Sequence, residues 1–239
     1  MNSKGKGIIT AVIVVLIALA AFCGFGYISQ RMTASEGITY LDKKEYQKAY
    51  EQFDHAAGKF TLIFTKQKKD VLFYEGEALY QMGEYGKAIE IYDELIDHEE
   101  SRAYSLKAYC LAQQKKLNKA IDVCDQGIKE HPDDGEIYCT KYAVLAKQEK
   151  YTQGLKVIER ALKQKELENK KEVLFARISA YESMFDFDTA YKYTKAYVKH
   201  MYAFYDFGLW TVLEKDAYGQ ERVIGRAGLF PSERLAGQI

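Results

Sequence analysis

Four histidines are the side chains best suited to catalysis or metal binding: His55, His98, His131 and His200. No two of them have the HExxH spacing of zinc peptidases, and the chain has neither a GxSxG nucleophile motif nor a phosphate-binding loop. Each histidine falls near the expected end of a helix, where an imidazole usually interacts with the helix dipole. The histidines therefore predict no catalytic site.

Adjacent carboxylates are the second group that could do acid–base chemistry. Glu99–Glu100 and Asp133–Asp134 form such pairs, but an acid–base pair needs different environments that separate its two pKa values. Both pairs lie beside expected turns, where Asp commonly caps the following helix. We expect no enzyme here: no catalytic residue, no metal site, no cofactor and no small-molecule substrate.

The four cysteines do not form a metal-binding pattern. Cys23 lies in an apolar N-terminal segment, and Cys110, Cys124 and Cys139 lack the CxxC spacing of zinc sites. Cys124 occupies an apolar position of an expected helix, which favours a buried thiol. A disulfide between Cys124 and Cys139 stays open as the alternative if the domain lies outside the cytoplasm, because adjacent helices carry the two residues.

The charge balance argues against a nucleic-acid partner. Lys plus Arg and Asp plus Glu number 34 each, whereas nucleic-acid binders usually carry a basic excess or patch. The densest basic run, Lys66–Lys69, is followed at once by Asp70. Such a run is most often a solvated helix start or linker.

The N-terminal segment predicts a membrane-spanning helix. Residues 7–30 form an uncharged run of 24 residues, which as a helix is about 36 Å long and exceeds a hydrocarbon core of about 30 Å. Lys4 and Lys6 lie on its short side, so the positive-inside rule keeps residues 1–6 in the cytoplasm. Residues 31–239 are then extracytoplasmic, and the protein is a single-pass protein of the cell membrane.

Two other N-terminal signals fit the same run less well. A cleaved signal peptide could use the "ALA" of residues 18–20, but the apolar run continues through Phe25 and Ile28. Lipid attachment at Cys23 would follow Phe22, which is bulkier than the small residue that such a site prefers. All three signals place the remaining chain across the membrane.

Small residues recur along the rest of the chain at a nearly constant spacing. Successive positions are 39, 32, 34 and 36 residues apart: Ala49, Ala88, Ala120, Gly154 and Ala190. A large apolar residue stands three residues before each: Tyr46, Tyr85, Leu117, Tyr151 and Phe187. A period in this range indicates a stack of helix pairs. In the second unit, Gly83 suits the end of the first helix, while Gly76 and Ala88 let the paired helices approach.

This pattern resembles the tetratricopeptide repeat, and "LFYEGEALYQMGEYGKAIEIYDELI" (72–96) matches it along its whole length. The resemblance implies an all-α fold, in which the transmembrane helix precedes a right-handed α-solenoid of about five helix-turn-helix repeats over residues 31–202. The expected units are 31–58, 69–100, 101–134, 135–168 and 171–202. Residues 203–239 lack the pattern, and we expect a capping helix over 203–215 followed by a weakly ordered tail.

The resemblance also implies a protein or peptide partner, bound in a concave groove that the first helix of each unit lines. The expected groove residues are Phe73, Tyr74, Glu77, Tyr80, Arg102, Tyr109, Phe175 and Glu182. Members that clamp a terminal carboxylate use Asn and Lys at positions that here hold Tyr74, Leu106, Thr140 and Ala176. Exposed aromatic slots suit an extended or helical protein segment instead. The alternative is that these aromatic residues only pack helix on helix.

Two functions follow from these expectations. The first is a membrane-tethered scaffold or adaptor that presents its groove on the extracytoplasmic side. The second is a self-associating structural component of an envelope assembly.

Overall fold

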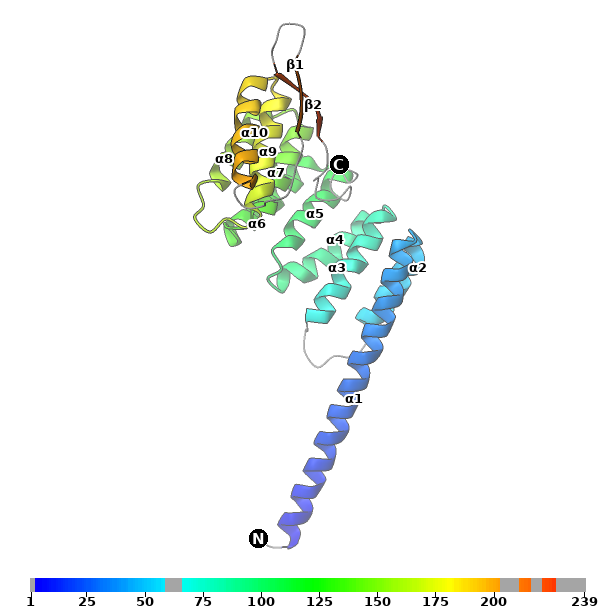
Figure 1. The fold of residues 1–239 in the computed structure, drawn as a ribbon. Coiled ribbons are helices and arrows are strands. Elements are labelled where there is room, and N and C mark those ends of the chain that lie inside the picture. The colour runs from blue at the N-terminus through cyan, green and yellow to red at the C-terminus, as the bar shows by residue number, and fades with distance from the viewer. Residues whose placement is uncertain (1–2, 59–65, 203–210, 216–220, 227–239) are drawn as a thin grey trace. The chain divides into compact units, whose positions relative to one another are not determined.

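Ten helices and two short strands make up the described residues, which in this computed structural model are 3–58, 66–202, 211–215 and 221–226 (Figure 1). The helices are α1 (Ser3–Asp42), α2 (Tyr46–Ala57), α3 (Lys66–Gln81), α4 (Tyr85–Asp97), α5 (Arg102–Gln113), α6 (Leu117–Glu130), α7 (Gly135–Lys147), α8 (Tyr151–Ala161), α9 (Lys170–Ser183) and α10 (Phe187–Tyr202). The strands are β1 (Thr211–Lys215) and β2 (Glu221–Arg226). The chain divides at Ala190 into two units, and each is described by itself.

Helix α1 joins the apolar segment to the first repeat without a break over its 40 residues. Within the described residues it is the one helix long and apolar enough to cross a membrane, a test that a signal sequence also passes. Its C-terminal part packs on α2, where buried Gln30 donates a hydrogen bond from Nε2 to the Ala56 carbonyl at 3.0 Å. The repeat therefore begins within the same helix that carries the apolar run.

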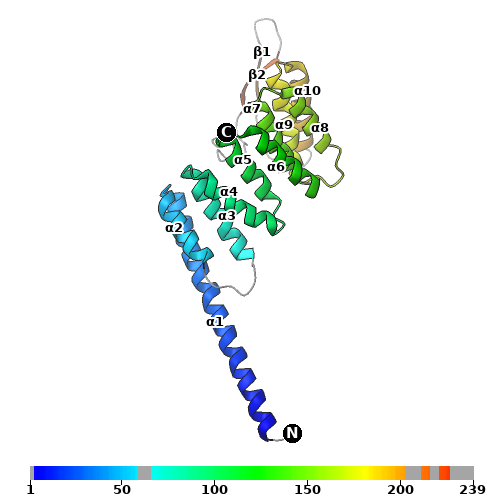
Figure 2. The ribbon, with the colours of Figure 1, turned by 180° about the vertical axis from the view of Figure 1, so that it is seen from behind.

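The first unit of the chain is a succession of helix pairs, as the repeat spacing predicted. Each helix from α1 to α8 packs against the next one along the chain (Figures 1 and 2). Backbone contacts also join first helices of neighbouring repeats, in the pairs α1–α3, α5–α7 and α7–α9. The predicted α-solenoid is confirmed. Residues 59–65, between the first two repeats, lie outside the described residues.

Glycines mark where an aromatic ring of the second helix presses on the first helix. A Cβ on Gly76 would lie 2.5 Å from Cε1 of Tyr92, so this position accommodates a ring rather than a neighbouring backbone. Gly37 makes the same room for Phe53 in the first repeat. In the fourth repeat the ring lies on the first helix instead: Tyr142 occupies the position equivalent to Gly76, and its ring lies against Gly154, the small residue of the second helix.

Every turn within a described repeat has one residue in the left-handed region, five residues before the small residue of the second helix. The five are Lys44, Gly83, Lys115, Glu149 and Phe185, with φ between 58° and 78°. Sequence reasoning identified the glycine turn alone. Left-handed φ costs a non-glycine residue free energy, so the packing of the two helices must offset that cost at the other four turns.

The second unit contains most of α10 and an antiparallel pair of strands, β1 and β2. The expected helix over 203–215 is wrong where it can be compared, because Thr211–Lys215 forms β1. Thr211 and Val212 are β-branched, and their restricted χ1 angles favour a strand over a helix. Residues 221–226 of the expected weakly ordered tail form β2. Residues 203–210, 216–220 and 227–239 lie outside the described residues.

Candidate partner-binding surface

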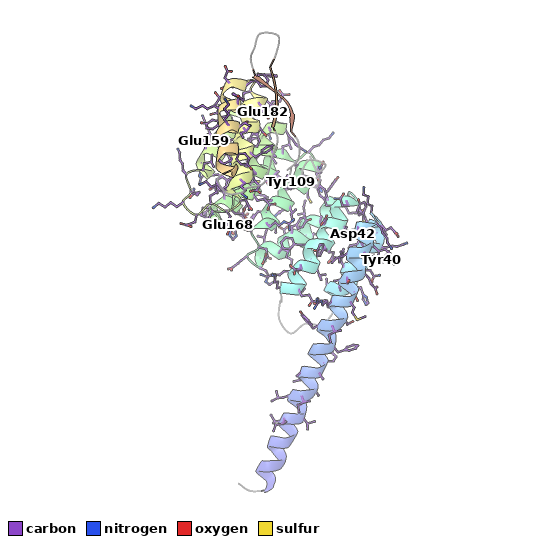
Figure 3. The ribbon with its side chains drawn as sticks, viewed as in Figure 1. Tyr40, Asp42, Tyr109, Glu159, Glu168 and Glu182 are labelled. Carbon is purple, nitrogen blue, oxygen red and sulfur yellow. The ribbon has the colours of Figure 1, made fainter. Side chains whose placement is uncertain are left out.

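The eight expected groove residues all lie on first helices of their repeats. Helix α3 carries Phe73, Tyr74, Glu77 and Tyr80, α5 carries Arg102 and Tyr109, and α9 carries Phe175 and Glu182 (Figure 3 labels Tyr109 and Glu182). Tyr74 and Arg102 are exposed, and the other six are half-buried. The eight residues therefore differ in their exposure to solvent, and the contacts of each one determine whether it can bind a partner.

Side chains bridge α3 to α5, the two neighbouring first helices whose backbones approach each other less than those of the other described neighbours. The Arg102 guanidinium carbon lies 5.6 Å from the centroid of the Phe73 ring. Toward the other end of the helices, Gln113 donates a hydrogen bond from Nε2 to Oη of Tyr80 at 2.8 Å. Two aromatic residues of the expected groove thus also hold adjacent repeats together.

Tyr109 makes a similar bridge from α5 to α7. Its hydroxyl hydrogen-bonds the Thr140 hydroxyl at 3.2 Å, and burial raises the pKa of Tyr109 to about 12. Burial also raises the pKa of Tyr80, while its hydrogen bond from Gln113 acts in the opposite direction. Both phenols therefore stay protonated at physiological pH and serve as neutral contacts between repeats.

Tyr74 contacts the preceding repeat and keeps an exposed edge. Its ring stacks on Phe53 of α2, with centroids 5.5 Å apart and planes inclined by 17°. The residue is nevertheless 36% exposed. Of the tyrosines in the expected set, Tyr74 offers the most ring surface to a partner, whereas Tyr80 and Tyr109 are committed to contacts between repeats.

An open cavity of about 420 Å³ lies between the start of α3 and the start of α5. Its lining residues are Lys66, Lys69, Asp70, Phe73 and Glu100. Lys69 and Glu100 form an ion pair across it. We call this cavity, together with Tyr74 and Arg102, the α3–α5 surface. Sequence reasoning found its aromatic residues but not its charged rim, for which the basic run at the start of α3 was the available signal.

The acidic residues and cysteines considered above as candidates for catalysis or metal binding have structural roles instead. Asp134 caps α7 by accepting a hydrogen bond from the Glu136 backbone N–H at 2.9 Å. Cys110, Cys124 and Cys139 are free thiols, so the alternative disulfide does not form, and burial raises the pKa of all three. Within the part of the chain that the structure describes, no three His, Cys, Asp or Glu side chains gather to hold a metal ion.

Comparisons with known proteins agree with this architecture. A family model described as "Tetratricopeptide repeat" matches residues 34–101 and 73–135. A tetratricopeptide repeat protein of Thermus thermophilus, TTC0263, aligns with a TM-score of 0.52 at 17% identity, over 71% of this chain and 90% of its own. MamA from Desulfovibrio magneticus RS-1 aligns with a TM-score of 0.50 at 16% identity, over 73% of this chain and 96% of its own. A comparison with curated proteins finds no significant match.

Proposed function

We propose that this chain is a membrane-tethered scaffold that binds a segment of another protein at the α3–α5 surface. The match of residues 34–101 and 73–135 to the tetratricopeptide repeat model and the α-solenoid fold support the proposal. One observation carries the proposal. Neighbouring first helices of the described solenoid meet by backbone contacts between α1 and α3 and from α5 to α9, but a cavity with aromatic and charged walls lies between α3 and α5. Proteins of this fold generally act as scaffolds for protein partners rather than as enzymes.

The chemistry of the α3–α5 surface favours a protein segment with an apolar side chain and charges of both signs. The Phe73 and Tyr74 rings supply apolar contact area, and large aromatic residues often dominate recognition energies. Arg102 lies over one ring and can pair with a carboxylate of the partner. The Lys69–Glu100 pair adds both charge signs to the rim. An extended or helical segment fits such a row of contacts along a first helix.

Single exposed residues test this surface with little risk to the fold. Arg102→Ala and Tyr74→Ala should each lower capture of the partner about tenfold or more, the typical effect of a central interface residue. Arg160→Ala is the matched control, because Arg160 is also exposed but lies on α8. Capture is measured by crosslinking in native membranes followed by mass spectrometry, and thermal melts check folding. Unchanged capture by both variants would place the binding surface elsewhere.

The apolar half of α1 supports the tether. Its side chains from Val12 to Phe22 are exposed, and the helix continues into the first repeat, so the repeats would start at the membrane surface. An intact-mass measurement on protein extracted from membranes separates an uncleaved anchor from a cleaved signal. A chain that still contains residue 1 supports the anchor, and loss of the apolar run would refute it.

Lys4 and Lys6 support the orientation, because basic residues that flank a span usually stay in the cytoplasm. Protease added to intact cells, or to protoplasts where a wall blocks access, should then remove the repeats. Repeats that stay protected until the membrane is broken would instead belong to a scaffold on the cytoplasmic side.

Self-association is the second candidate function, and an exposed aromatic pair favours it. Phe185 lies in the turn between α9 and α10, and Phe187 is the first residue of α10. The two residues are 81% and 61% exposed, and their ring centroids lie 6.1 Å apart. Apolar surface of this kind can mark a contact between copies. Light scattering on the full chain in detergent gives its mass, and a monomer would argue against this candidate.

A further inference from the structure

Three junctions between repeats carry the same ion pair. Each joins a basic residue of a first helix to an acidic residue of the preceding second helix: Lys107–Asp93 at 2.5 Å, Lys141–Asp125 at 2.5 Å and Arg177–Glu159 at 3.8 Å. The basic residue always directly precedes the first-helix position that packs on the second helix of its own repeat. The acidic residue always lies five positions after the second-helix small residue. The pairs therefore occupy equivalent places in successive repeats.

The junction between the first and second repeats breaks this pattern. Its acidic position holds Asp54 on α2, but its basic position holds Glu75 on α3, directly before Gly76. Glu75 is only 4% exposed. Its Oε2 atom is buried without a hydrogen-bond partner among the described residues. A carboxyl group thus takes the place where the next three junctions each have a cation.

The charges around Glu75 are mostly of its own sign. The Asp54 carboxylate on α2 and the Glu94 carboxylate on α4 act on it, and the Tyr50 phenol on α2, which is neutral, lies close enough to feel the charge of Glu75. Lys68, on the same helix as Glu75, favours the charged form of the Glu75 carboxyl. Lys68 also forms an ion pair with Glu94, at a distance of 3.3 Å, so its charge is shared between the two carboxylates. Burial, followed by Asp54 and then Glu94, raises the pKa of Glu75 to about 7.

We propose that the α2–α3 junction is a proton-controlled hinge, closed when the Glu75 carboxyl is neutral and open when it is ionised opposite Asp54. A neutral carboxyl can stay in this site, whereas a carboxylate without a partner is costly to bury. Helix α2 packs on α1, so opening changes how α3 and the following repeats are oriented relative to α1. If α1 spans the membrane, which rests on the function proposed above, the hinge sets the orientation of the α3–α5 surface relative to the bilayer.

The direction in which pH shifts the hinge follows from which state binds the proton more strongly. In the open state Glu75 returns to a value near 4.5, and in the closed state its pKa is about 7, so the closed state binds the proton more strongly. The closed state is therefore favoured at low pH, and it loses stability as the pH rises from 4.5 through 7. Between pH 5.5 and 8.5 these two values correspond to a change of roughly thirtyfold in the closed-to-open ratio.

Amide hydrogen exchange on the full chain in detergent micelles measures this ratio. Protection factors, corrected for the intrinsic effect of pH, should fall roughly thirtyfold in α3 between pH 5.5 and 8.5, and much less in α7. Equal protection of α3 at the two pH values would overturn the proposal. The readout requires no partner, so it can fail while the proposed scaffold function holds, and the reverse is also true.

Substitutions at the junction identify the titrating group. Glu75→Gln should remove the pH dependence of α3 protection, and Glu77→Gln, the matched control on the same helix, should keep it. Glu75→Lys should keep α3 protected at both pH values, because it recreates the ion pair of the later junctions with Asp54. If the glutamine variant does not fold, Asp54→Asn serves instead and should shrink the pH dependence. Persistence of the full effect in Glu75→Gln or in Glu75→Lys would refute the assignment.

Discussion

Replacing Gly76 with alanine should destabilise the second repeat through one steric contact. The new Cβ would lie 2.5 Å from Cε1 and 2.8 Å from Cζ of Tyr92, whereas carbon atoms pack at about 3.5–4.0 Å. The Tyr92 ring would have to move by about 1 Å to accept the methyl group. Because Tyr92 is only 1% exposed, its neighbours must move with it.

Two opposing effects set the magnitude. Overpacking of a filled core costs about 1–3 kcal/mol. Alanine is a better helix former than glycine by about 1 kcal/mol, which offsets part of that cost. Since the ring is fully enclosed, we expect the upper part of the overpacking range and a net loss of about 1–2 kcal/mol. For a domain of this size the melting temperature should fall by roughly 2–8 °C.

Thermal circular dichroism on the full chain in detergent measures this loss. Gly86→Ala is the matched control, because a Cβ at Gly86 on α4 meets no atom within 4 Å and should be neutral or slightly stabilising. Adding Tyr92→Leu to Gly76→Ala should recover part of the lost stability, and the coupling between the two changes isolates their contact. A Gly76→Ala protein that melts at or above the parent temperature would refute the packing described here.

Three further predictions concern the second and third repeats. Ala88→Leu should lower the free energy of unfolding by about 1–3 kcal/mol, because Ala88 is completely buried. Lys87→Leu is the exposed control, and equal melting temperatures of the two variants would show that the helix register is wrong. Lys115→Gly should raise stability by about 1 kcal/mol, because φ is 60° there, and a lower melting temperature would contradict this. Cys110 and Cys124 should resist alkylation at pH 8 until the protein unfolds, because burial raises the pKa of each thiol to about 12. Peptide mapping of the alkylated native protein would contradict this if either residue were rapidly modified.

The repeat architecture could be read from the sequence because its signals are local. Gly76 and Ala88 are 12 residues apart and belong to one helix pair, so the size pattern within a single unit suffices to predict the pairing. The apolar run before Arg31 is equally local, and it indicated a long N-terminal helix. That the expected groove residues fall on first helices follows from the same periodicity.

Contacts between repeats were decided by the tertiary structure. The sequence predicted that Tyr80 and Tyr109 are exposed groove residues. In the structure, the hydroxyl of each forms a hydrogen bond with a residue of the next first helix, about 30 residues away along the chain. Glu75 reads as an ordinary helical glutamate until the structure places it in a buried site close to Asp54. The turn at Lys115 adopts left-handed φ without glycine because the packed helices hold it there. Helix propensity and the spacing of apolar residues describe one helix pair at a time. The environment of a side chain at a junction between repeats depends instead on how two helix pairs stack, which these local signals do not contain.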